Sequence, residues 1–156
     1  LDRLVAMRLA LQTLMERRNP SLWRLSEVGR AQARDKLTRL LQDADTLVLV
    51  AEGMGGGVIG VVIGHVQRQV ELLPEIAGFI DTLFVEEAWR RRGVGTALVA
   101  RLCRFFAQRN IEEVTLRYVI GNTEGEQFWT GLGFTPRLIT AGTSRRALEA
   151  QLAKLG

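Results

Sequence analysis

One stretch constrains the fold more than any other: LFVEEAWRRRGVGTALVARL, from Leu83 to Leu102. Apolar residues run from Ile80 to Val85 as in a buried strand. After a glycine-bearing turn, apolar residues recur at the spacing of one helix face; they are Val94, Ala97, Leu98, Leu102, Phe105 and Phe106. The stretch therefore predicts a strand that turns directly into an amphipathic helix, which indicates an α/β domain.

The turn between strand and helix reads Arg90-Arg91-Arg92-Gly93-Val94-Gly95-Thr96-Ala97. The first turn of a helix carries backbone N–H groups that have no partner within the helix, and these lie at its positive end. Gly93 and Gly95 allow an anion to approach the backbone, and the arginines add fixed positive charge. The combination suits a pyrophosphate group.

Other glycine-rich phosphate motifs are excluded. A P-loop requires Gly-x-x-x-x-Gly-Lys-Ser/Thr, which the chain lacks, and a dinucleotide fingerprint would place a third glycine at Leu98. A second glycine cluster, from Gly53 to Gly57, has a predicted strand on each side and no helix after it, so it is interpreted as a hairpin turn.

The remaining motif, Arg-x-x-Gly-x-Gly after a strand, resembles the acyl-coenzyme A signature of the GNAT (Gcn5-related) N-acetyltransferase superfamily. The downstream sequence strengthens the resemblance. A predicted strand from Glu113 to Ile120 leads to Gly121-Asn122 and a short helix that ends in FWTGLGF, which is similar to the family's asparagine and Phe-Tyr-x-x-x-Gly-Phe block. The resemblance covers roughly Leu47 to Pro136.

The resemblance implies a mixed central β-sheet with helices on both faces, in which two parallel strands splay apart and hold acetyl-CoA between them. It implies an N-acetyltransferase that moves an acetyl group to a primary amine of a small molecule or peptide by direct attack. The cosubstrate contacts it implies are the backbone of Phe84 and Val85, a pyrophosphate wrap by Arg90, Arg92, Gly93, Val94, Gly95 and Thr96, and Asn122 and Phe128 on the pantetheine or adenosine side.

Three catalytic roles follow from such chemistry: an oxyanion donor, an acid for the thiolate and a base for the amine. The Val85 N–H is the candidate oxyanion donor. Trp129 stands where the family often has its tyrosine acid, and an indole cannot serve as that acid. Tyr118, the one tyrosine in the chain, is the substitute candidate, although packing on the sheet would also explain it.

Asp81 is the first candidate base, because it is a carboxylate in an apolar strand, four residues before Val85, and strand alternation predicts that it faces the same side as Leu83 and Val85. Pairing with an arginine would explain it equally well. His65 has a suitable reference pKa but is also explained as a hydrogen-bonded strand end. Weaker candidates are Glu52 and Glu75, and no metal site is predicted.

Composition limits the other classes of protein to which the chain could belong. With 156 residues and 47% hydrophobic content, the chain is expected to form one domain over residues 1–156. Net charge +4 and a pI of 10.2 suggest nucleic acid, but the arginines are dispersed and aromatic residues total only 6%. A single cysteine, no apolar run of about 18 residues and no signal-peptide pattern predict a cytoplasmic protein that binds neither membrane nor nucleic acid.

The remaining elements are predicted from periodicity and caps. They are helices Leu1–Arg18, Glu27–Gln42 (capped by Ser26) and Ser144–Leu155, strands Thr46–Glu52 and Val58–Val66, and a short strand Thr135–Leu138. The family's first strand has no counterpart; either it is absent from this sequence or this fold lacks it. The apolar stripe of the C-terminal helix would dock on its own domain or form a homodimer contact.

Three functions are ranked. The first is the acetyltransferase; the second is a non-catalytic acyl-CoA sensor or partner-binding module, favoured by the missing tyrosine; the third is a nucleic-acid-binding domain that uses Arg90 to Arg92. The acceptor cannot be identified from the sequence. Its pocket is expected between the first helices, the Gln67–Glu75 loop and the C-terminal segment, where Glu71, Glu75 and Asp81 would suit a cationic amine.

Overall fold

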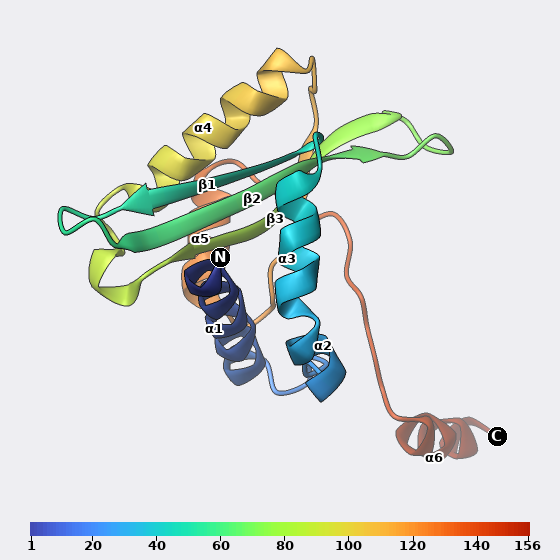
Figure 1. Cartoon of the computed structure of the whole chain (residues 1–156). Helices are drawn as coiled ribbons and strands as arrows, with labels where there is room; N and C mark the ends of the chain where they lie inside the picture. Colours follow the sequence, from blue (N-terminus) through green and yellow to red (C-terminus); the bar gives the residue numbers. More distant parts are fainter.

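A mixed four-stranded sheet with helices on both faces forms the body of the protein in a computed structural model that describes all residues 1–156 (Figure 1). Its strand order is β1-β2-β3-β4, with β1 at Thr46–Glu52, β2 at Val58–Arg68, β3 at Ile76–Val85 and β4 at Val114–Leu116. The first three strands are antiparallel, and β4 runs parallel to β3. The predicted fold class, with its two parallel neighbours, is confirmed.

The helices divide between the two faces of the sheet. α1 (Asp2–Arg18), α2 (Glu27–Ala31) and α3 (Ala33–Gln42) lie on one face (Figure 1). α4 (Val94–Gln108) covers the other, and α5 (Thr123–Gly131) follows β4. The predicted helix Glu27–Gln42 is present as two segments that meet at Gln32, although the Lys36 N–H still bonds the Gln32 carbonyl at 3.0 Å. Ser26 caps α2 as predicted.

Two hydrophobic clusters hold the layers together. One joins α4 to the sheet through residues such as Val62, Leu102 and Phe106, and the other joins α1 and α3 to the opposite face through Val61 and Ile63. Strand alternation along β2 produces this division. Close approach of α4 requires Gly64 on β2, since a Cβ there would lie 2.6 Å from Leu102.

The C-terminal segment lies outside this core. No strand forms at Thr135–Leu138, so that prediction was wrong; the sheet ends at β4, and residues 132–144 form no helix or strand. α6 (Arg145–Leu155) begins after the Ser144 cap, and Figure 1 shows it at the end of an extended linker, away from the other helices. None of the helices is both long enough and apolar enough to cross a membrane.

Candidate active site

A cleft opens where β3 and β4 part. The two strands pair only from Gly78 to Ile80, opposite Val114 to Leu116, so the predicted strand Glu113–Ile120 is shorter than expected. Beyond Ile80 the strands no longer pair, and a cavity of about 1910 Å³ is lined by residues of both. The same cavity is lined by the N-terminus of α4 and by α1, so it connects the two faces of the sheet.

A β-bulge lies at the point where β3 parts from β4. The β2–β3 register passes from the Ile63–Thr82 pair to the Gly64–Ile80 pair, which leaves Asp81 as an extra residue. Its carboxylate accepts hydrogen bonds from Arg8 of α1 at 2.9 Å and from the Thr82 hydroxyl at 2.6 Å. The prediction that Asp81 faces the same side as Leu83 was wrong, because the bulge interrupts strand alternation, and Leu83 packs on the α4 side.

The backbone of β3 beyond the bulge offers polar groups to the cleft. The Glu86 N–H bonds the Ile59 carbonyl of β2 at 2.8 Å. Antiparallel alternation therefore directs the backbone groups of Phe84 toward β2 and those of Leu83 and Val85 into the cleft. The Phe84 backbone, which the resemblance placed against the cosubstrate, therefore faces β2, whereas the Leu83 backbone faces the cleft together with that of Val85.

The N-terminus of α4 lines the same cavity. Gly93 has φ +82° and caps the helix without a side-chain hydrogen bond, so the N–H groups of Val94, Gly95 and Thr96 have no partner within the helix. A Cβ at Gly95 would lie 3.5 Å from Phe128 and 3.8 Å from Leu83. A larger side chain at Gly95 would therefore project into the space between β3 and α5.

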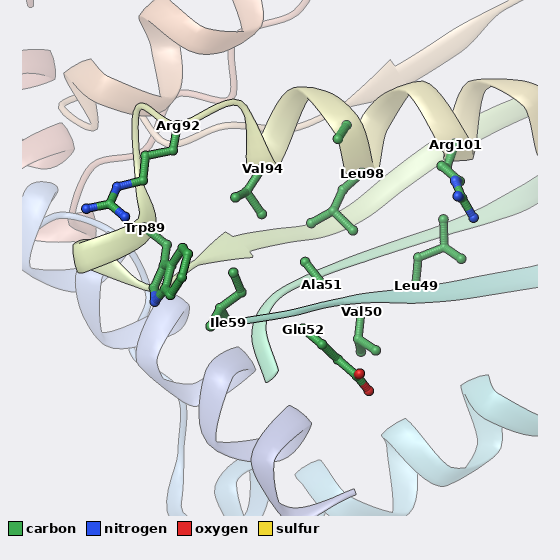
Figure 2. Close-up of a pocket in the computed structure, with 11 residues that line it drawn as sticks. Leu49, Val50, Ala51, Glu52, Ile59, Trp89, Arg92, Val94, Leu98 and Arg101 are labelled. Carbon is green, nitrogen blue, oxygen red and sulfur yellow. The ribbon is translucent and has the colours of Figure 1, made fainter. Parts of the chain in front are cut away.

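The three arginines of the turn point to different places. Arg90 donates to the Val85 carbonyl at 2.8 Å and lies 3.7 Å from Glu124, so it braces the cleft. Arg91, which was not among the predicted cosubstrate-binding residues, lines the cavity, and its backbone has φ +61°. Arg92, which was in that set, lies over the Trp89 ring at 5.2 Å and lines a separate cavity of about 460 Å³ between α4 and β1 (Figure 2).

Helix α5 closes the far side of the cleft. Asn122 caps it by accepting the Gly125 N–H at 3.4 Å, and Phe128 faces Gly95. Trp129 is buried, with its ring edge-on to Phe128 at 4.8 Å and to Phe134 at 5.4 Å. The position expected for a tyrosine acid is therefore part of the core.

The candidate acid lines the large cavity, whereas several of the candidate bases lie outside it. Tyr118 is half-buried and lines the cavity just beyond the end of β4. His65 lies outside it and packs its ring 5.2 Å from Phe79. Glu52 lines the smaller cavity instead. The Gln67–Glu75 loop, with Glu71 and Glu75, lines neither cavity, so the expectation that it borders the acceptor pocket is not met.

The class of protein is an α/β domain with a splayed mixed sheet, beside which a helix begins without a side-chain cap. The chain belongs to the acetyltransferase (GNAT) family, whose family model matches residues 9–134.

Solved structures of low sequence identity share the fold. A tetramutant of the BH1408 protein of Bacillus halodurans matches with a TM-score of 0.76 and 16% identity, over 90% of each chain. Aminoglycoside 6'-N-acetyltransferase AAC(6')-IG of Acinetobacter haemolyticus matches with a TM-score of 0.65 and 23% identity, over 87% of this chain and 92% of that one. Aminoglycoside N-acetyltransferase AAC(6')-Iy in complex with CoA matches with a TM-score of 0.60 and 22% identity, over 71% and 87%. No protein of curated function matches the chain.

Proposed function

We propose that the protein is an N-acetyltransferase that transfers an acetyl group from acetyl-CoA to a primary amine by direct attack. The observation that carries this proposal is the α4 N-terminus at the edge of the cleft, where unpartnered N–H groups and Gly95 face Leu83 and Phe128. A pyrophosphate fits the first feature, since N–H groups at the positive end of a helix bind anions. A narrow acyl-bearing arm fits the space beside Gly95, between Leu83 and Phe128.

The residues that would hold acetyl-CoA divide by chemistry. The phosphates would be bound by backbone N–H groups and by one fixed positive charge. The residues that supply them are Gly93, Val94, Gly95, Thr96 and Arg91. Leu83 and Val85 would bond the pantetheine arm as a neighbouring strand would, since their backbone groups face the cleft. Phe128 would pack against the arm, and Asn122 would keep α5 in place.

The transfer requires a neutral amine. Its nitrogen forms a bond to the acetyl carbon, the carbon–sulfur bond breaks, sulfur leaves with the electron pair and takes one proton, and nitrogen releases one. The N–H of Leu83 or Val85 would stabilise the negative charge that develops on the carbonyl oxygen. Tyr118 would give the thiolate its proton.

Asp81 fits a positioning role better than that of a base. Its Oδ2 atom already accepts from Arg8 and Thr82, so the carboxylate is held by a cation and a hydroxyl at the mouth of the splay. We assign it the task of fixing the bulge against α1. The amine proton would then pass to solvent, since the cavity is open to it.

Two relatives of this fold support the choice of reaction. AAC(6')-Iy was solved with CoA, and AAC(6')-IG is an N-acetyltransferase that acts on an amine-bearing antibiotic class. Release of free CoA thiol from acetyl-CoA, measured with a thiol reagent while a panel of amines is screened, tests the proposal. Amine-dependent release supports it, and release with no amine dependence contradicts it.

A non-catalytic acyl-CoA-binding module is the second candidate. The observation that favours it is Trp129, which lines the cavity at the position expected for a tyrosine acid but carries an indole that cannot serve as that acid. Acetyl-CoA binding in a calorimetric titration, together with no amine-dependent release of thiol, would support this candidate over the first.

A further inference from the structure

We infer that Arg90 is a positioning residue that sets the register in which the thioester-bearing arm of the cosubstrate pairs with β3. This inference rests on the proposed function, and it departs from the role of pyrophosphate ligand that the family resemblance implies for Arg90. It is carried by three contacts of the Arg90 side chain, which place its guanidinium group between the end of β3 and the start of α5.

The Arg90 guanidinium group is held from three sides. Its Nε atom donates to the Val85 carbonyl at 2.8 Å, and its Nη1 atom lies 3.7 Å from the Glu124 carboxylate. Its Cζ atom lies over the Phe84 ring at 5.7 Å, and only 26% of the side chain is exposed. Arg91 lines the cavity but takes part in none of the ion pairs or side-chain hydrogen bonds of the structure. Arg91 can therefore turn to a phosphate without leaving a partner unpaired, whereas Arg90 cannot.

The backbone fixes both anchors of this link. A 3₁₀ turn, Glu87–Trp89, follows β3, and the Arg90 N–H bonds the Glu87 carbonyl at 3.2 Å. This turn carries the chain back so that the Arg90 side chain reaches the strand it has just left. Glu124 lies in the first turn of α5, where the helix dipole favours a carboxylate. The link therefore joins the two walls of the cleft at fixed points.

The link removes one of two hydrogen-bond acceptors from the unpaired part of β3. Beyond the bulge, the carbonyl groups of Leu83 and Val85 face the cleft. The Val85 carbonyl accepts from Arg90, and the guanidinium group, which Glu124 holds on the α5 side, fills the approach to that oxygen from the cleft. An amide N–H of the arm can therefore bond only the Leu83 carbonyl, while the N–H groups of both strand residues stay free to donate.

A single acceptor fixes where the thioester lies. The arm pairs with β3 as a neighbouring strand would, and a slip to the next cleft-facing carbonyl moves it by two residues, about 7 Å. With the Val85 carbonyl occupied, one register remains, and the thioester carbonyl stays beside the N–H group that stabilises its negative charge. Without Arg90, part of the bound cosubstrate would pair in the other register and lie out of reach of that N–H group.

Steady-state transfer from two acetyl donors to the amine with the fastest thiol release tests this inference. The donors are acetyl-CoA and S-acetylpantetheine, which has the same thioester arm but no phosphate. We expect Arg90→Gln to lower kcat about tenfold with both donors and to change either KM by less than about threefold. Arg91→Gln should instead raise the KM for acetyl-CoA about fivefold and leave that for S-acetylpantetheine unchanged. Arg104→Gln, which removes an exposed guanidinium group of α4 outside both cavities, is the matched control.

Glu124→Gln tests the link from its other anchor. Loss of the carboxylate charge should release Nη1 of Arg90 and lower kcat about threefold with both donors. The double variant should lose no more than Arg90→Gln alone, because both substitutions break one link. The Glu124 side chain is 46% exposed, so its replacement is not expected to unfold the protein, and a thermal melt of each variant checks this.

The outcomes separate this inference from the proposed function. A KM increase confined to acetyl-CoA in Arg90→Gln would overturn the inference, because a lost phosphate ligand has that effect. An unchanged kcat in Arg90→Gln, or additive losses in the double variant, would overturn it as well. Absence of transfer to any amine by the wild type would overturn the proposed function instead. NMR of bound acetyl-CoA labelled with ¹³C at the thioester carbonyl then tests the register: a resonance that differs between the wild type and Arg90→Gln supports the inference, and an identical one overturns it.

Discussion

The two ends of the cavity between β3 and β4 differ in the groups that line them: backbone groups at one end and side chains at the other. At the α4 end, the polar groups that face the cavity belong to the backbone. They are the N–H groups of the first helical turn, which includes two glycines with its cap, and the amides of Leu83 and Val85. At the α1 end, side chains from α1 and its following loop form the walls. A site made of backbone demands glycine at fixed spacing and so leaves a motif, whereas a site made of side chains from distant segments leaves none.

The largest expected effect on turnover lies at Tyr118, which lines the cavity just beyond the end of β4. Tyr118→Phe removes the proposed acid and retains the ring, so we expect kcat to fall about 100-fold while both KM values stay within about twofold. Steady-state kinetics with acetyl-CoA and an acetylated amine measures this. An unchanged kcat would mean that Tyr118 only packs on the sheet and that the thiolate leaves without an enzymic acid.

Asp81→Asn tests whether the bulge residue acts as a base or as a positioning residue. The amide keeps the hydrogen bond from Arg8 but loses the charge, so we expect kcat/KM to fall by only about three- to tenfold. The shape of its pH profile should be the same as in the wild type. Loss of the profile's acidic limb, together with a fall of 100-fold or more, would restore Asp81 as the general base.

The smallest expected effect comes from the arginine turn. Arg91→Gln should weaken acetyl-CoA binding about fivefold, which corresponds to about 1 kcal/mol, because its charge lies at the cavity. Arg92→Gln should change it by less than about twofold, because that guanidinium packs on Trp89 beside the smaller cavity. Calorimetric titration at two salt concentrations compares them; equal losses would show that the two arginines act only through net charge.

The accuracy of the sequence-based predictions follows the same division. Strand β1 was predicted with its bounds, and the strand, turn and helix around Gly93 and Gly95 are present, because local periodicity and glycine spacing encode them. The bulge at Asp81 was missed, because one extra residue in β3 is defined only by pairing with β2. Arg91 and Arg92 could not be ranked, since adjacent identical side chains diverge only through the backbone conformation of the turn.

The α1 end of the cavity was predicted only in outline, since the first helices and the C-terminal segment were expected to border a pocket, but the individual side chains were not. Trp23 lines the cavity but carries no periodic signal, and most of the other lining residues are about 60 to 115 positions away in the sequence. The Gln67–Glu75 loop lies at the tip of the β2–β3 hairpin (Figure 1), and its residues line neither cavity. Contacts of this range depend on tertiary packing.

Calorimetric titration of acetyl-CoA into the wild type, Gly95→Trp and Gly142→Trp tests the central claim most directly. The indole at position 95 would fill the space beside Phe128 and Leu83, whereas Gly142 has open space around it. We predict binding to the wild type and to Gly142→Trp, and at least about 100-fold weaker binding to Gly95→Trp at an unchanged melting temperature. Equal binding to all three proteins would contradict the claim that acetyl-CoA lies in the cleft at the α4 N-terminus.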